Sequence, residues 1–134
     1  MGNFTDAEVA FLRGKRLGHL ATVNARGEPH VVPVGYVFDE ATETLAIGGN
    51  GMSRSKKFRE ALGNAPIAFV VDGQNAEGQP CGVETRGRAE IAPVGGGALR
   101  SGWDEEHILL RPARIVAWGI DTDPYSPANS RRVE

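Results

Sequence analysis

The sequence predicts a mainly β protein, an antiparallel β-barrel with two or three short covering helices. Six or seven short segments of β-forming residues follow one another, each bounded by turn-forming residues. Strands and helices do not alternate along the chain as they do in a parallel, doubly wound sheet. The 134 residues suit one domain, and 40% hydrophobic with 24% charged residues is the composition of an ordinary globular protein.

A helix is predicted near the start of the chain, over residues 6–13. Thr5 and Glu8 have the spacing of a capping box, in which each side chain accepts a hydrogen bond from the other residue's backbone N–H. Phe4 and Val9 have the spacing of a hydrophobic staple. Because both signals mark the same boundary, we expect the helix to begin there and to cover one end of the sheet.

After this helix the hydrophobic period becomes that of strands, whose side chains alternate between two faces. Residues 81–91 alternate most clearly, with Val83 and Ala89 facing inward and Glu84 and Arg86 outward. The other expected strands are residues 17–23, 30–38, 44–48 and 67–71, and a last pair, 108–110 and 115–118, joined through 111–114.

The remaining segments are predicted to be one further helix, loops and a tail. The helix is expected over residues 53–62, because Gly63 and then Pro66 can end it. Residues 73–80 and 93–102 are expected to be loops, the second flexible because it contains three successive glycines. Residues 1–120 then form a single domain, and 121–134 a polar, mobile tail.

The strand over residues 30–38 carries apolar residues on both of its faces. We therefore expect both faces to be covered, as in a barrel wall with something packed outside it. Pro33 has no N–H for a sheet ladder, which indicates an interrupted or edge position. The two-sided strand, together with the small size of the domain, predicts a homodimer.

Composition and charge argue against several classes of function. A net charge of −2 argues against a general nucleic-acid-binding surface. No apolar run approaches the roughly 20 residues of a membrane span, and residues 1–13 do not resemble a signal peptide, so a cytoplasmic protein is expected. Cys81 is the only cysteine, and the three histidines lack metal-ligand spacing, so no metal site is predicted.

The strongest local signal is a glycine-rich strand exit that runs into a cationic helix start. Gly48, Gly49, Asn50 and Gly51 precede Met52, and four cations then fall within six residues: Arg54, Lys56, Lys57 and Arg59. Cations at a helix N-terminus are unfavourable unless an anion is bound there by N–H groups, hydroxyls and basic side chains. The pattern predicts a phosphate site that includes Ser53 or Ser55, with a solvated basic face as the alternative.

No residue is nominated as a catalytic acid, base or nucleophile. The sequence shows no Ser-His-Asp arrangement and no paired-carboxylate signature. Chemistry carried by a redox cofactor needs only binding, orientation and the exclusion of water from the protein. A phosphate-anchored, flavin-like ring beside an apolar barrel wall would meet that requirement.

The chain resembles the pyridoxamine 5′-phosphate oxidase-like superfamily, which comprises flavin and deazaflavin oxidoreductases with a split β-barrel. The resemblance spans residues 11–119 and rests on an ordered set of segments. They are residues 11–12, 17–23, 27–34, 54–59, 64–66, 70–72, 87–89 and 115–119.

Within that superfamily the chain is most similar to the branch that uses coenzyme F-420, a deazaflavin. The resemblance implies that Arg54 and Lys56 bind the coenzyme's phosphate with help from Lys57, and that the partner subunit of a homodimer completes the pocket. FMN is the alternative cofactor. The implied cofactor-binding residues are Pro33, Val34, Ile47, Gly48, Gly49, Asn50, Met52, Arg54, Ser55, Lys56, Lys57 and Trp118.

The function that this resemblance implies is hydride transfer from reduced F-420 to a small conjugated organic substrate. Three alternatives stay open: an FMN-dependent oxidoreductase of the same fold, a non-enzymatic protein that binds F-420 or a flavin, and an interaction domain whose basic helix is merely solvated. Vitamin B6 oxidation is disfavoured, because Arg131 and Arg132 do not match the C-terminal substrate-binding pattern of those oxidases.

Overall fold

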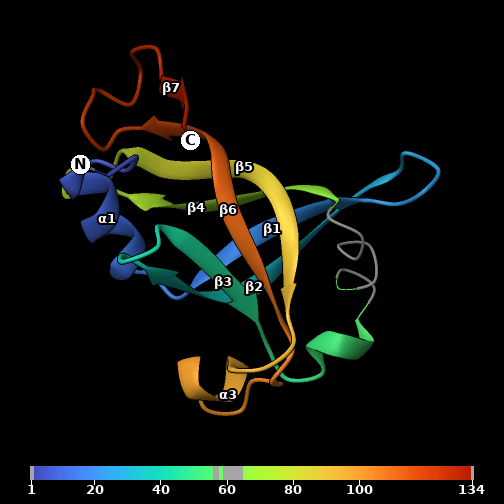
Figure 1. Ribbon diagram of the computed structural model, residues 1–134. Helices are drawn as coiled ribbons and strands as arrows, with labels where there is room; N and C mark the ends of the chain where they lie inside the picture. Colours follow the sequence, from blue (N-terminus) through green and yellow to red (C-terminus); the bar gives the residue numbers. More distant parts are fainter. Residues whose placement is uncertain (1, 56–57, 59–64, 134) are drawn as a thin grey trace.

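The computed structural model describes residues 2–55, 58 and 65–133, and confirms a mainly β, antiparallel barrel. The sheet has the strand order β3-β2-β1-β4-β5-β6-β7, and a further pairing of β3 with β6 closes the first six strands into a barrel (Figure 1). The elements are α1 (Asp6–Arg13), β1 (Leu17–Val23), β2 (Pro29–Asp39), β3 (Thr44–Gly48), the 3-10 helix η1 (Met52–Arg54), β4 (Pro66–Gln74), β5 (Pro80–Ala92), α3 (Gly96–Leu99), β6 (His107–Trp118) and β7 (Asn129–Arg132).

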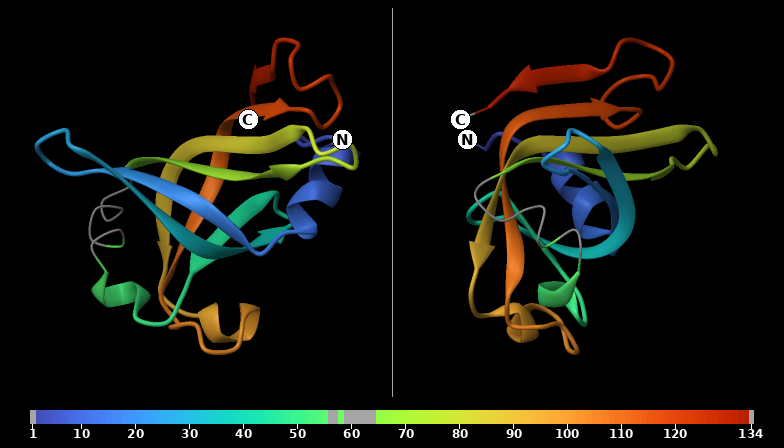
Figure 2. Two further views of the ribbon diagram at one scale, coloured as in Figure 1. Left: turned by 180° about the vertical axis from the view of Figure 1, so that it is seen from behind. Right: turned by 90° about the vertical axis from the view of Figure 1, so that its right-hand side faces the viewer.

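Helix α1 covers one end of the barrel, as expected (Figures 1 and 2). The capping box is confirmed: the Thr5 hydroxyl accepts from the Glu8 N–H, and the Glu8 carboxylate accepts from the Thr5 N–H. Leu12 and Phe4 are buried in the barrel core, and the phenol of Tyr36 donates a hydrogen bond to the Leu12 carbonyl. The helix is therefore fixed both by its caps and by the core.

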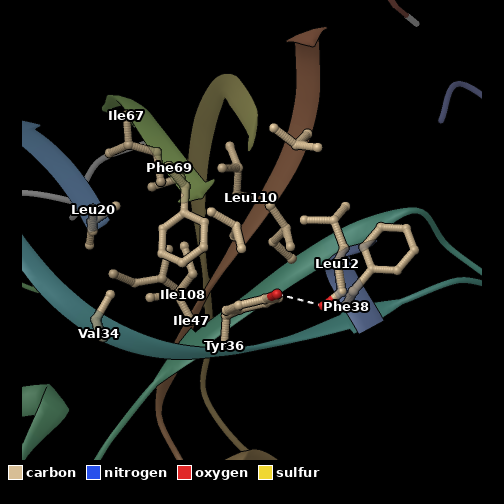
Figure 3. Packing of buried hydrophobic residues seen from close by; sticks show 14 of the residues in the cluster. Leu12, Leu20, Val34, Tyr36, Phe38, Ile47, Ile67, Phe69, Ile108 and Leu110 are labelled. Carbon is tan, nitrogen blue, oxygen red and sulfur yellow. Dashed lines mark hydrogen bonds between the residues drawn. The ribbon is translucent and has the colours of Figure 1, made fainter. Parts of the chain in front are cut away.

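The barrel interior is filled with side chains. Apolar residues from every barrel strand form one cluster. Within it, the rings of Tyr36 and Phe69 pack edge to face, with 5.3 Å between the ring centroids (Figure 3). Phe38 makes a similar contact with Phe4 from the N-terminal segment. Because the described side chains fill this small barrel, we expect a large ligand to bind outside the barrel wall.

The prediction of two separate strands at residues 108–110 and 115–118 is wrong. One continuous strand, β6, runs from His107 to Trp118 along the whole of β5. Pro112 is accommodated because it pairs with Gly87 at a register shift next to Arg86. The irregular ladder at that point tolerates a residue that has no N–H to donate.

The prediction of a mobile tail is wrong for the residues of β7, which pair with β6. Arg131 reaches from β7 to α1, where its guanidinium donates to both carboxylate oxygens of Glu8 and to the Asn3 carbonyl. Glu8 is 0% exposed. The tail thus supplies the cation that a fully buried carboxylate requires.

The segments between strands also differ from expectation in part. The loop expected at residues 93–102 contains a short helix, α3, and the helix expected over 53–62 is described only as η1 and, at Phe58, as helical. The rest of that predicted helix, including Lys56 and Lys57, lies outside the described residues. No helix in the described part of the chain is long and apolar enough to cross a membrane.

The outward-facing residues Val31 and Pro33 in the first half of β2 are exposed, whereas Gly35 and Val37 in the second half are partly covered. Strand β3 pairs with β2 from Gly35 to Asp39, so the first half of β2 has β1 as its only strand neighbour in the described chain. Pro33 lies in that half, which confirms the predicted edge position. Val31 is 66% exposed in the single chain, so the expected cover of this face by a partner stays a prediction.

Candidate functional site

The segment that follows β3 is anchored to the barrel core by two buried side chains. Met52 and Phe58 both join the barrel core. Between them, the Ser55 hydroxyl donates to the Met52 carbonyl and accepts from the Phe58 N–H. Arg54 remains exposed. The predicted phosphate-binding residues that the structure describes, Arg54 and Ser55, thus lie on one short turn anchored to the core.

Gly49 and Asn50 form the open part of this exit. A Cβ built on Gly49 would have no heavy atom within 4 Å, and Asn50 is exposed. Gly51 has a φ of 77°, a left-handed conformation that favours glycine and starts η1. The segment therefore presents accessible backbone next to Arg54, and these residues fit a phosphorylated ring compound lying against them.

Trp103 covers Gly48, a contact that the sequence analysis did not predict. A Cβ on Gly48 would lie 2.3 Å from Cε3 of Trp103, so only glycine allows this close approach. Gly35, the residue opposite Gly48 on β2, is approached in the same way by Arg100, with Nη1 2.5 Å from the position of a Cβ. The sequence shows Gly35 and Gly48 as glycines within strands, which indicates a close approach by other residues. It does not show that Arg100 and Trp103 are those residues.

The segment that carries Trp103 is tied to the β3 exit by two hydrogen bonds. The Asp104 N–H donates to the Gly49 carbonyl at 3.0 Å, and the Gly51 N–H donates to the Asp104 carboxylate at 3.1 Å. The Arg100 guanidinium lies 5.5 Å from the Trp103 ring centroid. The residues after α3 are therefore part of the candidate site, adjacent to the predicted cofactor-binding segment.

The predicted ring-lining residues separate into two groups. Pro33 is exposed on the outer face of the barrel, beside His19 of β1. Val34 and Ile47 are buried in the barrel core, as Figure 3 shows. A ligand outside the barrel can therefore meet Val34 and Ile47 only through their backbone.

Trp118 lies on the outer face at the end of β6, against Gly82. It lines a cavity of about 300 Å³, and a second cavity of about 440 Å³ lies next to the first, with Ala21 and Ala68 lining both. Together they form an outer groove across β1, β2, β4 and β5. Its lining is His19, Ala21, Thr22, Val23, Pro29, Val31, Pro66, Ile67, Ala68, Phe69, Val70, Glu84, Arg86, Gly87, Arg88, Ala113 and Trp118.

The outer groove is suited to binding rather than to proton transfer. Its walls are mainly apolar, and the Glu84 carboxylate is held in a two-point ion pair with Arg86. Among the described residues, no group of three or more His, Cys, Asp or Glu side chains is placed to hold a metal ion. An apolar groove of this kind can bind a planar ring or part of a second protein surface.

The fold and site define an antiparallel barrel with a filled core, a ligand-sized groove outside it and an open glycine-rich turn beside an arginine. The pyridoxamine 5′-phosphate oxidase family matches residues 4–127, and the chain belongs to that family. The chain is also 40% identical over 137 residues to a 5a,11a-dehydrotetracycline/5a,11a-dehydrooxytetracycline reductase of Streptomyces rimosus. That alignment covers 97% of this chain and 93% of the relative.

Solved structures share the fold at low sequence identity. A heme-binding protein of Mycobacterium smegmatis aligns with a TM-score of 0.68 at 19% identity over 98% of this chain, which spans 60% of that protein. An FAD-binding protein of the same organism aligns with a TM-score of 0.66 at 19% identity, covering 85% of this chain and 93% of the other. General Stress Protein 26 of Bacillus anthracis aligns with a TM-score of 0.67 at 18% identity, and the alignment covers 96% of this chain and 97% of the other.

Proposed function

We propose that the protein is a reductase that transfers a hydride from reduced coenzyme F-420 to a small conjugated organic substrate. The observation that carries the reductase part of this proposal is the 40% identity, over nearly the whole of both chains, to a dehydrotetracycline reductase. A substrate of that kind is a conjugated polycyclic ketone. The choice of F-420 rests on the resemblance to the branch that uses this coenzyme. When bound, the reduced deazaflavin supplies the hydride.

The chain's own residues would then bind and orient rather than react. Arg54, with Lys56 and Lys57, would hold the phosphate, and the accessible backbone at Gly49 would let the ring lie close to the β3 exit. Trp103 would bound the ring on one side and exclude water from it. No side chain is assigned as a proton donor, so solvent or the substrate itself provides any proton.

The same proposal includes a homodimer with the cofactor site at the subunit interface. Three apolar side chains on the outer face of β1 and β2 are exposed in the single chain: Leu17 at 64%, Val23 at 45% and Val31 at 66%. Val23 and Val31 line the outer groove, which is itself mainly apolar, and Leu17 lies at the other end of β1 from Val23. A second copy placed on this face would bury those side chains and close the groove over a bound ring.

Titration with F-420 and with FMN tests the cofactor. We expect a micromolar dissociation constant for F-420, and Arg54→Ala or Lys56→Ala should raise it at least tenfold through loss of a charge-assisted hydrogen bond. Arg26→Ala, on an exposed hairpin, is the charge-matched control and should leave it unchanged. Tight FMN binding with weak F-420 binding, visible as a yellow purified protein, would instead favour the FMN-dependent alternative.

Turnover separates an enzyme from a binding protein. Purified protein with reduced F-420 should reduce 5a,11a-dehydrotetracycline, followed by the return of the oxidised coenzyme's absorbance. Tight F-420 binding without reduction of that compound or of a panel of enones and quinones would support the non-enzymatic alternative. Unchanged F-420 affinity in both Arg54→Ala and Lys56→Ala would mean that these cations do not hold the phosphate, and would favour the alternative in which the basic helix is merely solvated.

A further inference from the structure

A cationic cavity of about 390 Å³ lies between α1 and α3, apart from the outer groove and from Arg54. It is floored by β2 and lined by Leu12, Arg13, Lys15, Arg16, Tyr36, Val37, Phe38, Leu99 and Arg100. Figure 2 shows α1 and α3 on either side of β2, well separated along the barrel. Four of these nine residues are cations, and none is an acid.

The four cations differ in their partners. Arg13 forms an ion pair with Glu40 at 2.9 Å, both largely exposed. The Lys15 ammonium lies 5.5 Å from the centroid of the Phe11 ring. Neither Arg16 nor Arg100 has a carboxylate of the described residues within ion-pair distance.

Arg100 is held in place by two contacts within the protein. Its Nη2 donates to the Arg16 carbonyl at 3.2 Å, and its guanidinium lies against the Trp103 ring. Burial, and then the nearby charge of Arg16, lower the pKa of Arg100 below its usual range. Two neighbouring guanidinium groups without a carboxylate repel each other, and a bound oxygen anion would remove that repulsion.

The cavity adjoins the proposed cofactor segment through Arg100. Its guanidinium lies on Gly35, and Gly35 pairs with Gly48, the residue that Trp103 covers. We propose that Arg16 and Arg100 bind an acidic oxygen group of the substrate, a carboxylate, phosphate or enolate. This inference rests on the proposed reductase function, and it adds that the conjugated substrate is an anion held on the α1–α3 side of the ring.

Calorimetric titration of the purified protein with a conjugated carboxylate tests the cavity without turnover. The probe is 3-oxocyclohex-1-ene-1-carboxylate, and neutral cyclohex-2-en-1-one is its matched control. Arg16→Gln and Arg100→Gln should each weaken carboxylate binding about tenfold, the loss of one charge-assisted hydrogen bond, with no change for the neutral ketone. Arg132→Gln, exposed on β7, should change neither. Arg16→Gln is the more decisive variant, because the Arg16 side chain is exposed and its substitution should disturb the fold least.

Titration of the same variants with F-420 shows whether the anion belongs to the substrate or to the coenzyme. Unchanged F-420 affinity with weakened carboxylate binding supports a substrate site. A tenfold loss of F-420 affinity in Arg16→Gln would assign the cavity to the coenzyme's acidic tail and overturn the proposal, as would carboxylate binding that neither variant weakens. If the native protein bound neither F-420 nor FMN, the reductase function would fail, while carboxylate binding lost in both variants would still support the anion site.

Discussion

The outer surface of the barrel differs between its two halves. On β1 and β2 it carries exposed apolar side chains, among them Leu17 and Val31, whereas on β5 and β6 it carries paired charges such as Glu90 with Arg111. The β6 edge is further covered by β7, but no described element covers the outward face of β1. The first half therefore has the apolar composition expected of the proposed dimer interface, whereas the second has the composition of a surface in contact with water.

The largest expected effect comes from placing a charge on the apolar half. Val31→Glu should dissociate the proposed homodimer, because an unpaired carboxylate buried between subunits costs several kcal/mol. Light scattering should show the native mass at twice 14.3 kDa and the variant at 14.3 kDa.

The control for this change is Val94→Glu, at a 69% exposed position beside α3 and away from the face. It should leave the mass unchanged. A native protein of 14.3 kDa at micromolar concentration would refute the dimer, and with it the interpretation of the apolar half as an interface.

The next effect concerns the buried pair that holds the tail against α1. Glu8→Gln keeps an acceptor for the Thr5 N–H but removes the charge that Arg131 meets, so we expect a loss of about 3 kcal/mol in the free energy of unfolding. Urea denaturation monitored by circular dichroism measures it. A loss below 1 kcal/mol would mean that the tail contributes little to the fold.

A smaller, pH-dependent effect is expected on the inner side of β2. Burial raises the pKa of Tyr36 well above its ordinary value near 10, with a smaller opposing effect from Arg100. The unfolded chain therefore releases this proton first, so stability is intact below pH 10 and falls as the pH rises further.

Tyr36→Phe removes both the ionisation and the hydrogen bond to the Leu12 carbonyl. We expect a loss of about 1–2 kcal/mol at pH 8, and a shallower decline above pH 10 than in the native protein. Urea midpoints at pH 8 and pH 10.5 give both numbers. Parallel declines in the two proteins would show that other groups cause the alkaline loss.

The smallest effect is expected on the charged half. Glu90→Gln breaks an ion pair with Arg111 in which both side chains are about half exposed. Such pairs contribute roughly 0–1 kcal/mol to the free energy of unfolding, so the urea midpoint should hardly move. Because salt screens exposed charges, the shift should be smaller still at high salt. A loss comparable to that of Glu8→Gln would contradict the idea that this half is an ordinary solvated wall.

Local patterns predicted most of the fold. The alternation along β5 and the capping box at Thr5 both depend on residues a few positions apart, and both are confirmed. Strand β7 could not be predicted, because Asn129–Arg132 has no apolar alternation and is held by the β6 edge and by Glu8. The continuity of β6 was missed because Pro112 indicates a break unless its partner, Gly87, is known.

The candidate site was predictable where it is contiguous in sequence. The β3 exit and its cations form a local pattern, and the structure places Gly49, Arg54 and Ser55 on one turn. Trp103 was missed because its contact with Gly48 joins segments far apart in the chain. The cavity beside α1 was missed for the same reason, since Arg16 and Arg100 meet only after the barrel closes.

The contact between Glu8 and Arg131 spans 123 residues, which sets an order on folding during synthesis. A ribosome releases α1 early, but the helix cannot bury Glu8 at low cost until the distant arginine has emerged. The incomplete chain must therefore keep that face of α1 in contact with water or with a chaperone while nearly all of the barrel is translated. Final docking of the helix then becomes a late event that coincides with the pairing of β7.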